Sequence, residues 1–81
     1  MSIYKKIDAY RGEHNSLKTV YKVKNLQYYY RVSVYPDGAG FRADIEHCSS
    51  CYQNKWDIFA GDFYAKTELG THRAALKYLN R

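Results

Sequence analysis

The segment HCSSC, at residues 47–51, holds the side chains best suited to chemistry. Histidine nitrogen and cysteine sulfur are preferred zinc ligands, and a structural zinc site needs four of them. The segment supplies His47, Cys48 and Cys51, so the fold would have to add a distant ligand such as His72. The sequence has no second Cys-x-x-Cys pair to complete such a site. We therefore expect a tight connection of small residues and no metal, with a zinc site as the alternative.

Catalytic arrangements are equally sparse. A redox Cys-x-x-Cys pair sits at a helix N-terminus in a βαβ unit, and the pattern around residues 47–51 predicts neither. Only Asp44 and Glu46 form a carboxylate pair on one face of a predicted strand. The run DGAG, at 37–40, is typical of a hairpin turn and not of a phosphate-binding loop. We expect neither enzyme activity nor a cofactor.

Size and charge narrow the class of protein further. A chain of 81 residues is expected to form one domain, residues 1–81, with a core too thin to enclose a large cofactor. Its net charge of +5 favours anionic partners, either nucleic acid or an acidic protein surface, with ordinary solubilising charge as the alternative. No apolar run is long enough for a signal peptide or a membrane span, so we expect a cytoplasmic protein with reduced thiols.

Alternating polar and apolar residues predict a sheet. The strongest signal is QYYYRVSVY, at 27–35, which is rich in β-branched and aromatic residues and turns Tyr28, Tyr30, Val32 and Val34 toward the core. For residues 2–10 a short helix is the rival interpretation. The last strand is expected to place Trp56 and Ile58 on its core side. The predicted strands are 2–10, 17–24, 27–35, 41–47 and 54–61, with a hairpin turn at 36–40.

Residues 66–81 are predicted to form a helix. Thr67 or Thr71 can cap its N-terminus, and cations fill its last turns, where the helix dipole favours them. One stripe at helical spacing is expected to face the sheet, formed by Leu69, His72, Ala75, Leu76 and Leu79. The predicted fold is therefore α+β, an antiparallel sheet of four or five strands with one C-terminal helix packed on one face.

Such a fold leaves one face of the sheet uncovered. Its basic side chains could contact phosphates, and its tyrosines could stack on bases. The alternative is an ordinary solvated face, which antiparallel sheets often have. The predicted binding residues on this face are Lys22, Lys24, Tyr29, Arg31, Tyr35 and Arg42.

The segment WDIFAGDFYAKTELGTHRAALKYL, at 56–79, carries a family resemblance. A last strand followed by Gly, an aromatic residue, Thr and an Ala-Ala helix resembles the AP2-type and integrase arm-type DNA-binding domains, over residues 18–79. The matching residues are Gly61, Phe63, Thr67, Ala74 and Ala75. The resemblance implies that the open sheet face lies in the DNA major groove. Asp44 and Glu46 depart from the basic face of arm-type domains, and the spacing from Phe63 to the helix is longer than usual.

Two partner classes follow from these observations. The first is DNA or RNA, bound by the open basic and aromatic face. The second is an acidic surface on a host protein or ribonucleoprotein complex, because a tyrosine-rich surface suits protein recognition. In size and general character the chain is similar to small inhibitors or adaptors encoded by phages and mobile elements, including anti-CRISPR proteins. A sheet this short also leaves an edge through which a homodimer could form.

Overall fold

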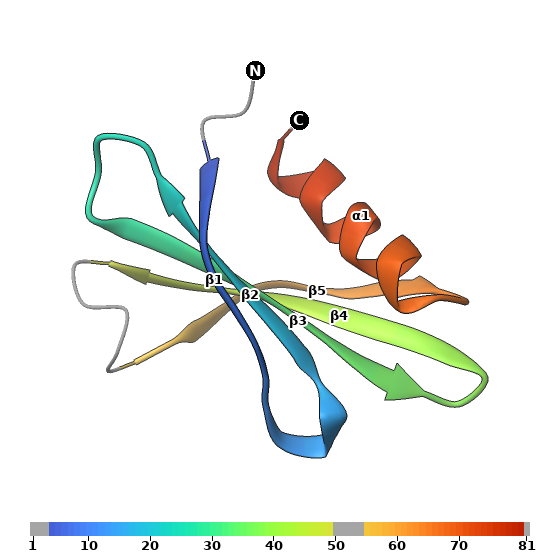
Figure 1. The fold of residues 1–81 in the computed structure, drawn as a ribbon. Helices are drawn as coiled ribbons and strands as arrows, with labels where there is room; N and C mark the ends of the chain where they lie inside the picture. The colour runs from blue at the N-terminus through green and yellow to red at the C-terminus, as the bar shows by residue number, and fades with distance from the viewer. Residues whose placement is uncertain (1–3, 50–54, 81) are drawn as a thin grey trace.

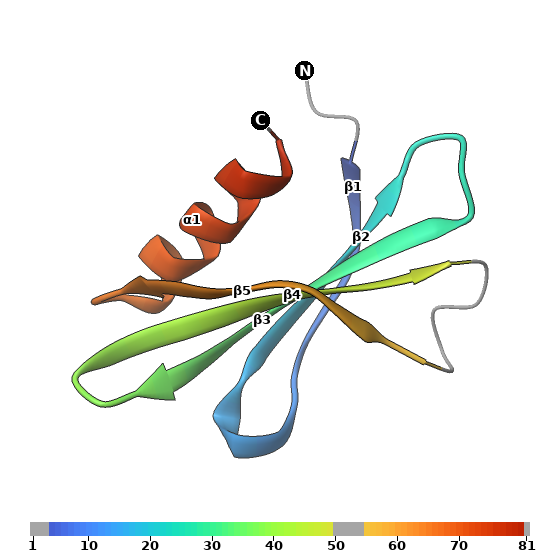
Figure 2. The same cartoon turned by 180° about the vertical axis from the view of Figure 1, so that it is seen from behind.

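Five strands pair in sequence order to form one antiparallel sheet, and a single helix packs on one of its faces (Figure 1, Figure 2). The computed structural model describes residues 4–49 and 55–80. The α+β fold predicted from the sequence is confirmed, with five strands. The elements are β1 (Tyr4–Arg11), the 3₁₀ turn η1 (Glu13–Asn15), β2 (Leu17–Val23), β3 (Tyr28–Asp37), β4 (Gly40–Ser49), β5 (Asp57–Ala65) and α1 (Glu68–Leu79).

The core lies between α1 and the two central strands. Val32 of β3 is paired with Ile45 of β4, and both are fully buried. The predicted core face of β3 is therefore correct. Small helix residues let α1 approach the sheet closely. The buried apolar cluster consists of Val32, Val34, Ala43, Ile45, Ala75 and Leu79.

The hairpin between β3 and β4 lies where the Asp-Gly signal predicted it. Asp37 pairs with Gly40, so only Gly38 and Ala39 form the turn. Gly38 has φ +62°, a left-handed conformation that glycine adopts without the steric cost of a Cβ atom.

The start of α1 is capped by Thr67 and not by Thr71. The Thr67 hydroxyl accepts a hydrogen bond from the Gly70 backbone N–H at 2.9 Å, while Thr71 is fully buried inside the helix. The prediction that Leu69 faces the sheet is wrong, because this side chain is 60% exposed. At about 100° per residue, Leu69 lies roughly 160° around the helix from the buried Thr71. In the described part of the chain, no helix has the length and apolar character needed to cross a membrane.

A β-bulge divides β1 into two halves. Lys6 lies opposite Tyr21 and Asp8 lies opposite Val20, so Ile7 has no partner in the register. The described part of segment 2–10 is a strand and not a helix, but its predicted simple alternation is wrong. The extra residue shifts the side-chain parity, so Asp8 and Tyr10 face away from α1 while Lys6 stays on the helix side.

The orientation of β5 differs from the prediction. Register shifts separate the partners of Ala43, Ile45 and Glu46, but the two shifts cancel and leave Ile58 on the same face as Tyr64. The prediction that Trp56 and Ile58 lie on the core side is wrong, because Trp56 lies against Arg31 of the opposite face. Ile58 pairs with Glu46 on the face away from α1 and is 65% exposed. The neighbouring Phe59 turns toward the helix side instead.

The core position of Ile45 and the surface position of Ile58 allow a matched test of this fold. We expect Ile45→Ala to lower the free energy of unfolding by about 2–5 kcal/mol, because it leaves a cavity. Ile58→Ala should change it by less than about 0.5 kcal/mol. Urea denaturation followed by tryptophan fluorescence measures both. Equal losses would contradict the assigned faces of β4 and β5.

Candidate functional site

The face of the sheet opposite α1, the open face, carries most of the predicted binding residues. Their side chains alternate along β2, β3 and β4 with those that face the helix. These residues are Lys22, Tyr29, Arg31, Tyr35 and Arg42. The sixth, Lys24, lies one residue beyond the end of β2, in the connection to β3.

Arg31 is fully engaged with its neighbours. Its guanidinium donates two hydrogen bonds to the Glu46 carboxylate, at 2.8 and 2.9 Å, in a bidentate geometry. It also donates to the Tyr10 hydroxyl at 3.3 Å and lies 4.6 Å from the centre of the Trp56 ring. The side chains of the ion pair are only 16% and 17% exposed. Arg31 therefore organises the open face, and its charge is already neutralised.

The carboxyl of Glu46 is held in its charged form. Burial alone would raise its pKa, but hydrogen bonds from Arg31 and Ser33 outweigh burial, helped by the positive charges nearby. The pKa of Glu46 therefore lies below its ordinary value of 4.5. The Ser33 hydroxyl donates to Glu46 at 2.9 Å and accepts from the Lys18 ammonium at 3.0 Å. One connected polar network thus crosses the middle of the open face.

Arg42 is paired with two acids. Its Nε donates to Asp37 Oδ2 at 2.6 Å, and its Nη1 donates to Asp62 Oδ1 at 3.1 Å. The guanidinium carbon lies 5.9 Å from the centre of the Tyr64 ring. With two carboxylates against one guanidinium, this corner of the sheet carries no excess positive charge for a phosphate.

The two predicted stacking tyrosines are also constrained. Tyr29 is only 8% exposed, and its hydroxyl donates to the Gln27 side chain at 3.0 Å. The Tyr35 hydroxyl donates to Asp44 Oδ2 at 3.3 Å. Tyr29 thus offers little ring surface to a ligand, and Tyr35 lies beside a carboxylate that would repel phosphate.

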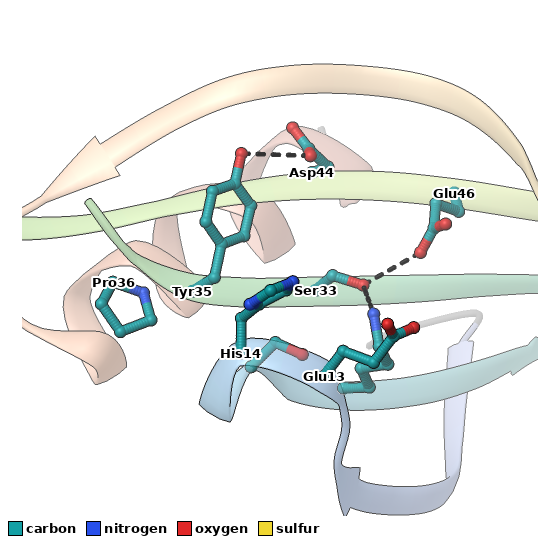
Figure 3. A pocket seen from close by; sticks show the side chains of 9 residues that line it. Glu13, His14, Ser33, Tyr35, Pro36, Asp44 and Glu46 are labelled. Atoms are coloured by element: carbon teal, nitrogen blue, oxygen red, sulfur yellow. Dashed lines mark hydrogen bonds between the residues drawn. The ribbon is translucent and has the colours of Figure 1, made fainter.

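A pocket of about 620 Å³ lies on the open face, where η1 folds back in front of the strands (Figure 3). Its carboxylates outnumber its cations, and the Lys18 ammonium is already bonded to Ser33. The Ser16 hydroxyl is buried there without a hydrogen-bond partner in the described residues. The excess of acids makes this pocket unfavourable for a phosphate. It is lined by Glu13, His14, Ser16, Lys18, Ser33, Tyr35, Pro36, Asp44 and Glu46.

Lysines without an acidic partner gather at one end of the sheet, where β1 begins and β2 ends. Lys5 lies directly opposite Lys22, and Lys6 is the next residue along β1. Lys24 follows the end of β2. Within residues 4–49 and 55–80, none of these four forms an ion pair. Lys5, Lys6, Lys22 and Lys24 are the lysine end. Sequence reasoning identified Lys22 and Lys24 but missed the other two, because strand pairing brings them together.

The alternative zinc ligands have other roles where the structure describes them. His47 shares a hydrogen bond with the Tyr28 hydroxyl at 2.6 Å, and His72 shares one with Tyr21 at 2.8 Å. Cys48 is buried in β4, and Cys51 lies outside the described residues. Among residues 4–49 and 55–80, no three histidine, cysteine or acidic side chains are placed to hold a metal ion.

Comparison with known proteins finds no matching family model, curated protein or solved structure. Function therefore has to be inferred from the geometry and charge of this chain.

The role of Glu46 can be tested by substitution. We expect Glu46→Gln to lower the free energy of unfolding at pH 7 by about 1–3 kcal/mol, because Arg31 loses its charged partner in a half-buried site. Glu13→Gln, an exposed acid at the pocket, is the matched control and should have little effect. Urea denaturation measures both variants.

The same pair predicts a pH dependence. Because the pKa of Glu46 is depressed in the folded protein, its stabilising effect is present above its ordinary value of 4.5. The effect is lost as the pH falls through the lower pKa of the folded state. The stability difference between the wild-type protein and Glu46→Gln should shrink progressively below pH 4.5. A difference that stayed constant down to pH 3 would contradict this assignment.

Proposed function

We propose that the protein is a non-enzymatic module that binds the phosphate backbone of nucleic acid through the lysine end. The observation that carries the proposal is the pair of Lys5 and Lys22, directly opposite each other on neighbouring strands. Like charges in this position destabilise a sheet. A bound anion would relieve that repulsion, and β1 is an edge strand that a ligand can reach from solvent.

The distribution of charge supports the same site. Of the cations on the open face, Arg31 and Arg42 are neutralised by acids. The excess positive charge of the protein, +5 in total, therefore resides mainly on lysines. Lysine binds phosphate as a point charge, with little dependence on base sequence. The proposed contact thus lies at one end of the open face, whereas the resemblance to AP2-type and arm-type domains implies contact by the centre of that face. A cytoplasmic location would give access to both DNA and RNA.

A second candidate function is binding to a host protein or ribonucleoprotein complex, as an inhibitor or adaptor. One observation favours it. Ile58 is 65% exposed on the open face, where Arg31 is stacked on Trp56. Tryptophan and arginine are common at the energetic centres of protein interfaces. In this case Ile58→Asp would abolish partner binding, and Lys22→Glu would leave it intact.

Binding can be measured by fluorescence anisotropy with a labelled 30-base-pair duplex. We expect affinity to fall steeply between low and physiological salt, because each phosphate contact releases counterions. Lys22→Glu should weaken binding several-fold and reduce the slope of log K against log salt by about 0.9 for the lost contact. Lys66→Glu, at an exposed lysine before α1, makes the same change in net charge. Equal losses in the two variants, or no salt-dependent binding, would overturn the proposed site.

The same substitution should have the opposite effect on stability. Lys22→Glu replaces the repulsion between Lys22 and Lys5 with an attraction between a glutamate and Lys5. We therefore expect the free energy of unfolding to rise by about 0.2–1 kcal/mol. Lys66→Glu has no such partner in the register. Thermal denaturation without nucleic acid measures both variants. A destabilised Lys22→Glu protein would contradict the assumed repulsion.

A further inference from the structure

Ring side chains gather on the helix side of the sheet, at the end that α1 does not cover. In Figures 1 and 2, α1 lies over the half of the sheet near the β3–β4 turn, and the strands extend past it toward the β2–β3 connection. The rings come from four strands, β1, β3, β4 and β5, and α1 reaches them near its end, where the Tyr78 ring lies 6.2 Å from the Phe59 ring. Tyr4, Tyr28, Tyr30, His47 and Phe59 form what we term the aromatic shelf.

The rings of the shelf hold one another in place. Tyr30 is the centre, with ring centroids 5.6 Å from Tyr4, 5.3 Å from Tyr28 and 5.1 Å from Phe59, all edge-to-face. His47 lies 5.5 Å from Phe59 and shares a hydrogen bond with the Tyr28 hydroxyl. Rings fixed in this way lose little conformational entropy when a ligand binds.

The shelf is accessible and compatible with a phosphate nearby. Phe59 is 43% exposed, and the other four rings are partly exposed. Burial, with the neighbouring Tyr28 and Tyr4, raises the pKa of Tyr30 to about 12. A tyrosine is already neutral at physiological pH at its ordinary pKa of 10, so the shift only reinforces that this phenol does not repel a phosphate.

The shelf and the lysine end meet at the edge strand β1, where Tyr4 of the shelf precedes Lys5 and Lys6. On the helix side, Lys6 lies opposite Tyr21, Tyr21 opposite Tyr30, and Tyr30 opposite His47, in a row that spans about 14 Å because neighbouring strands are about 4.8 Å apart. The Tyr21 hydroxyl is bonded to His72 of α1, and the paired Lys5 and Lys22 face the open side of the sheet. A single strand that stacks a base on the shelf would therefore reach Lys6 on the same side and pass around the β1 edge to Lys5 and Lys22.

We infer that the ligand is single-stranded nucleic acid whose bases stack on the aromatic shelf. This inference rests on the proposed function, the binding of phosphates by the lysine end. Ring stacking on bases, combined with cations that track the backbone, is the usual means of binding single strands. In a duplex the base faces are already stacked on one another, so the shelf cannot reach them.

The first test uses the unmodified protein and three labelled ligands in fluorescence anisotropy. These are a mixed-sequence single strand of 12 nucleotides, an abasic strand of the same length, and a 30-base-pair duplex. Stacking of one base is expected to tighten binding of the normal strand at least about fivefold over the abasic strand, which keeps the phosphates and lacks the bases. Equal affinity for the normal and abasic strands would overturn the inference.

A matched pair of variants locates the contact. Phe59→Leu removes a shelf ring, and Tyr64→Leu removes a ring of similar exposure from the open face of the same strand. We expect Phe59→Leu to cost about fivefold or more in affinity for the normal strand, with no change for the abasic strand. Tyr64→Leu should change neither affinity. Equal effects of the two variants would overturn the assignment to the shelf.

The outcomes separate this inference from the proposal beneath it. If no ligand binds, both fail. If the duplex and the two single strands bind equally, and Lys22→Glu weakens all three, the lysine end is correct and the shelf is not. If the normal strand binds more tightly than the abasic strand, Phe59→Leu removes the difference, and Lys22→Glu weakens binding of both strands, both stand.

Discussion

One helix of 12 residues has to cover the apolar face of five strands. At 1.5 Å per residue such a helix is about 18 Å long, which is too short to cover the full length of the strands that it crosses. The fully buried core is accordingly small and central, around Val32 and Ile45 under Ala75. Toward the uncovered end, aromatic rings replace aliphatic side chains, because a ring can be half buried and still present a polar or stacking edge to solvent.

Within residues 4–49 and 55–80, no helix or second sheet packs on the open face, and a polar network stabilises it instead. The bidentate pair of Arg31 and Glu46, extended by Ser33 and Lys18, crosses β2, β3 and β4. This network neutralises Arg31, and Asp37 and Asp62 neutralise Arg42 at the other end of the face. On the open face, Lys5 and Lys22 at the ends of β1 and β2 form no ion pair within the described residues. The features that stabilise the open face therefore move the favourable position for an anion away from its centre and toward the lysine end.

Much of the fold could be predicted from local patterns. The alternation in β3, the Asp-Gly turn and the helical stripe after Lys66 correctly predicted the sheet, one hairpin and α1. The errors have different causes. A bulge at Ile7 reverses the parity of the residues that follow it in β1. In β5 the two register shifts cancel, so Ile58 lies on the same open face as Tyr64, and its apolar character alone had suggested the core side. An inserted residue leaves no local mark in a polar and aromatic sequence, because both faces accept such side chains.

The sequence by itself determined the chemical inventory of this protein: an excess of lysine and arginine over acid, an abundance of tyrosine and a sheet with one exposed face. It also placed Lys22 and Lys24 among the candidate contacts. Only the tertiary structure decided which charges are available, because ion pairing depends on distance across strands. It paired Arg31 and Arg42 with acids, placed Lys5 beside Lys22, and gathered rings from four strands at the end that α1 leaves open. Those placements follow from strand register and from the position of α1 on the sheet, which are set by packing between distant parts of the chain and not by neighbouring residues.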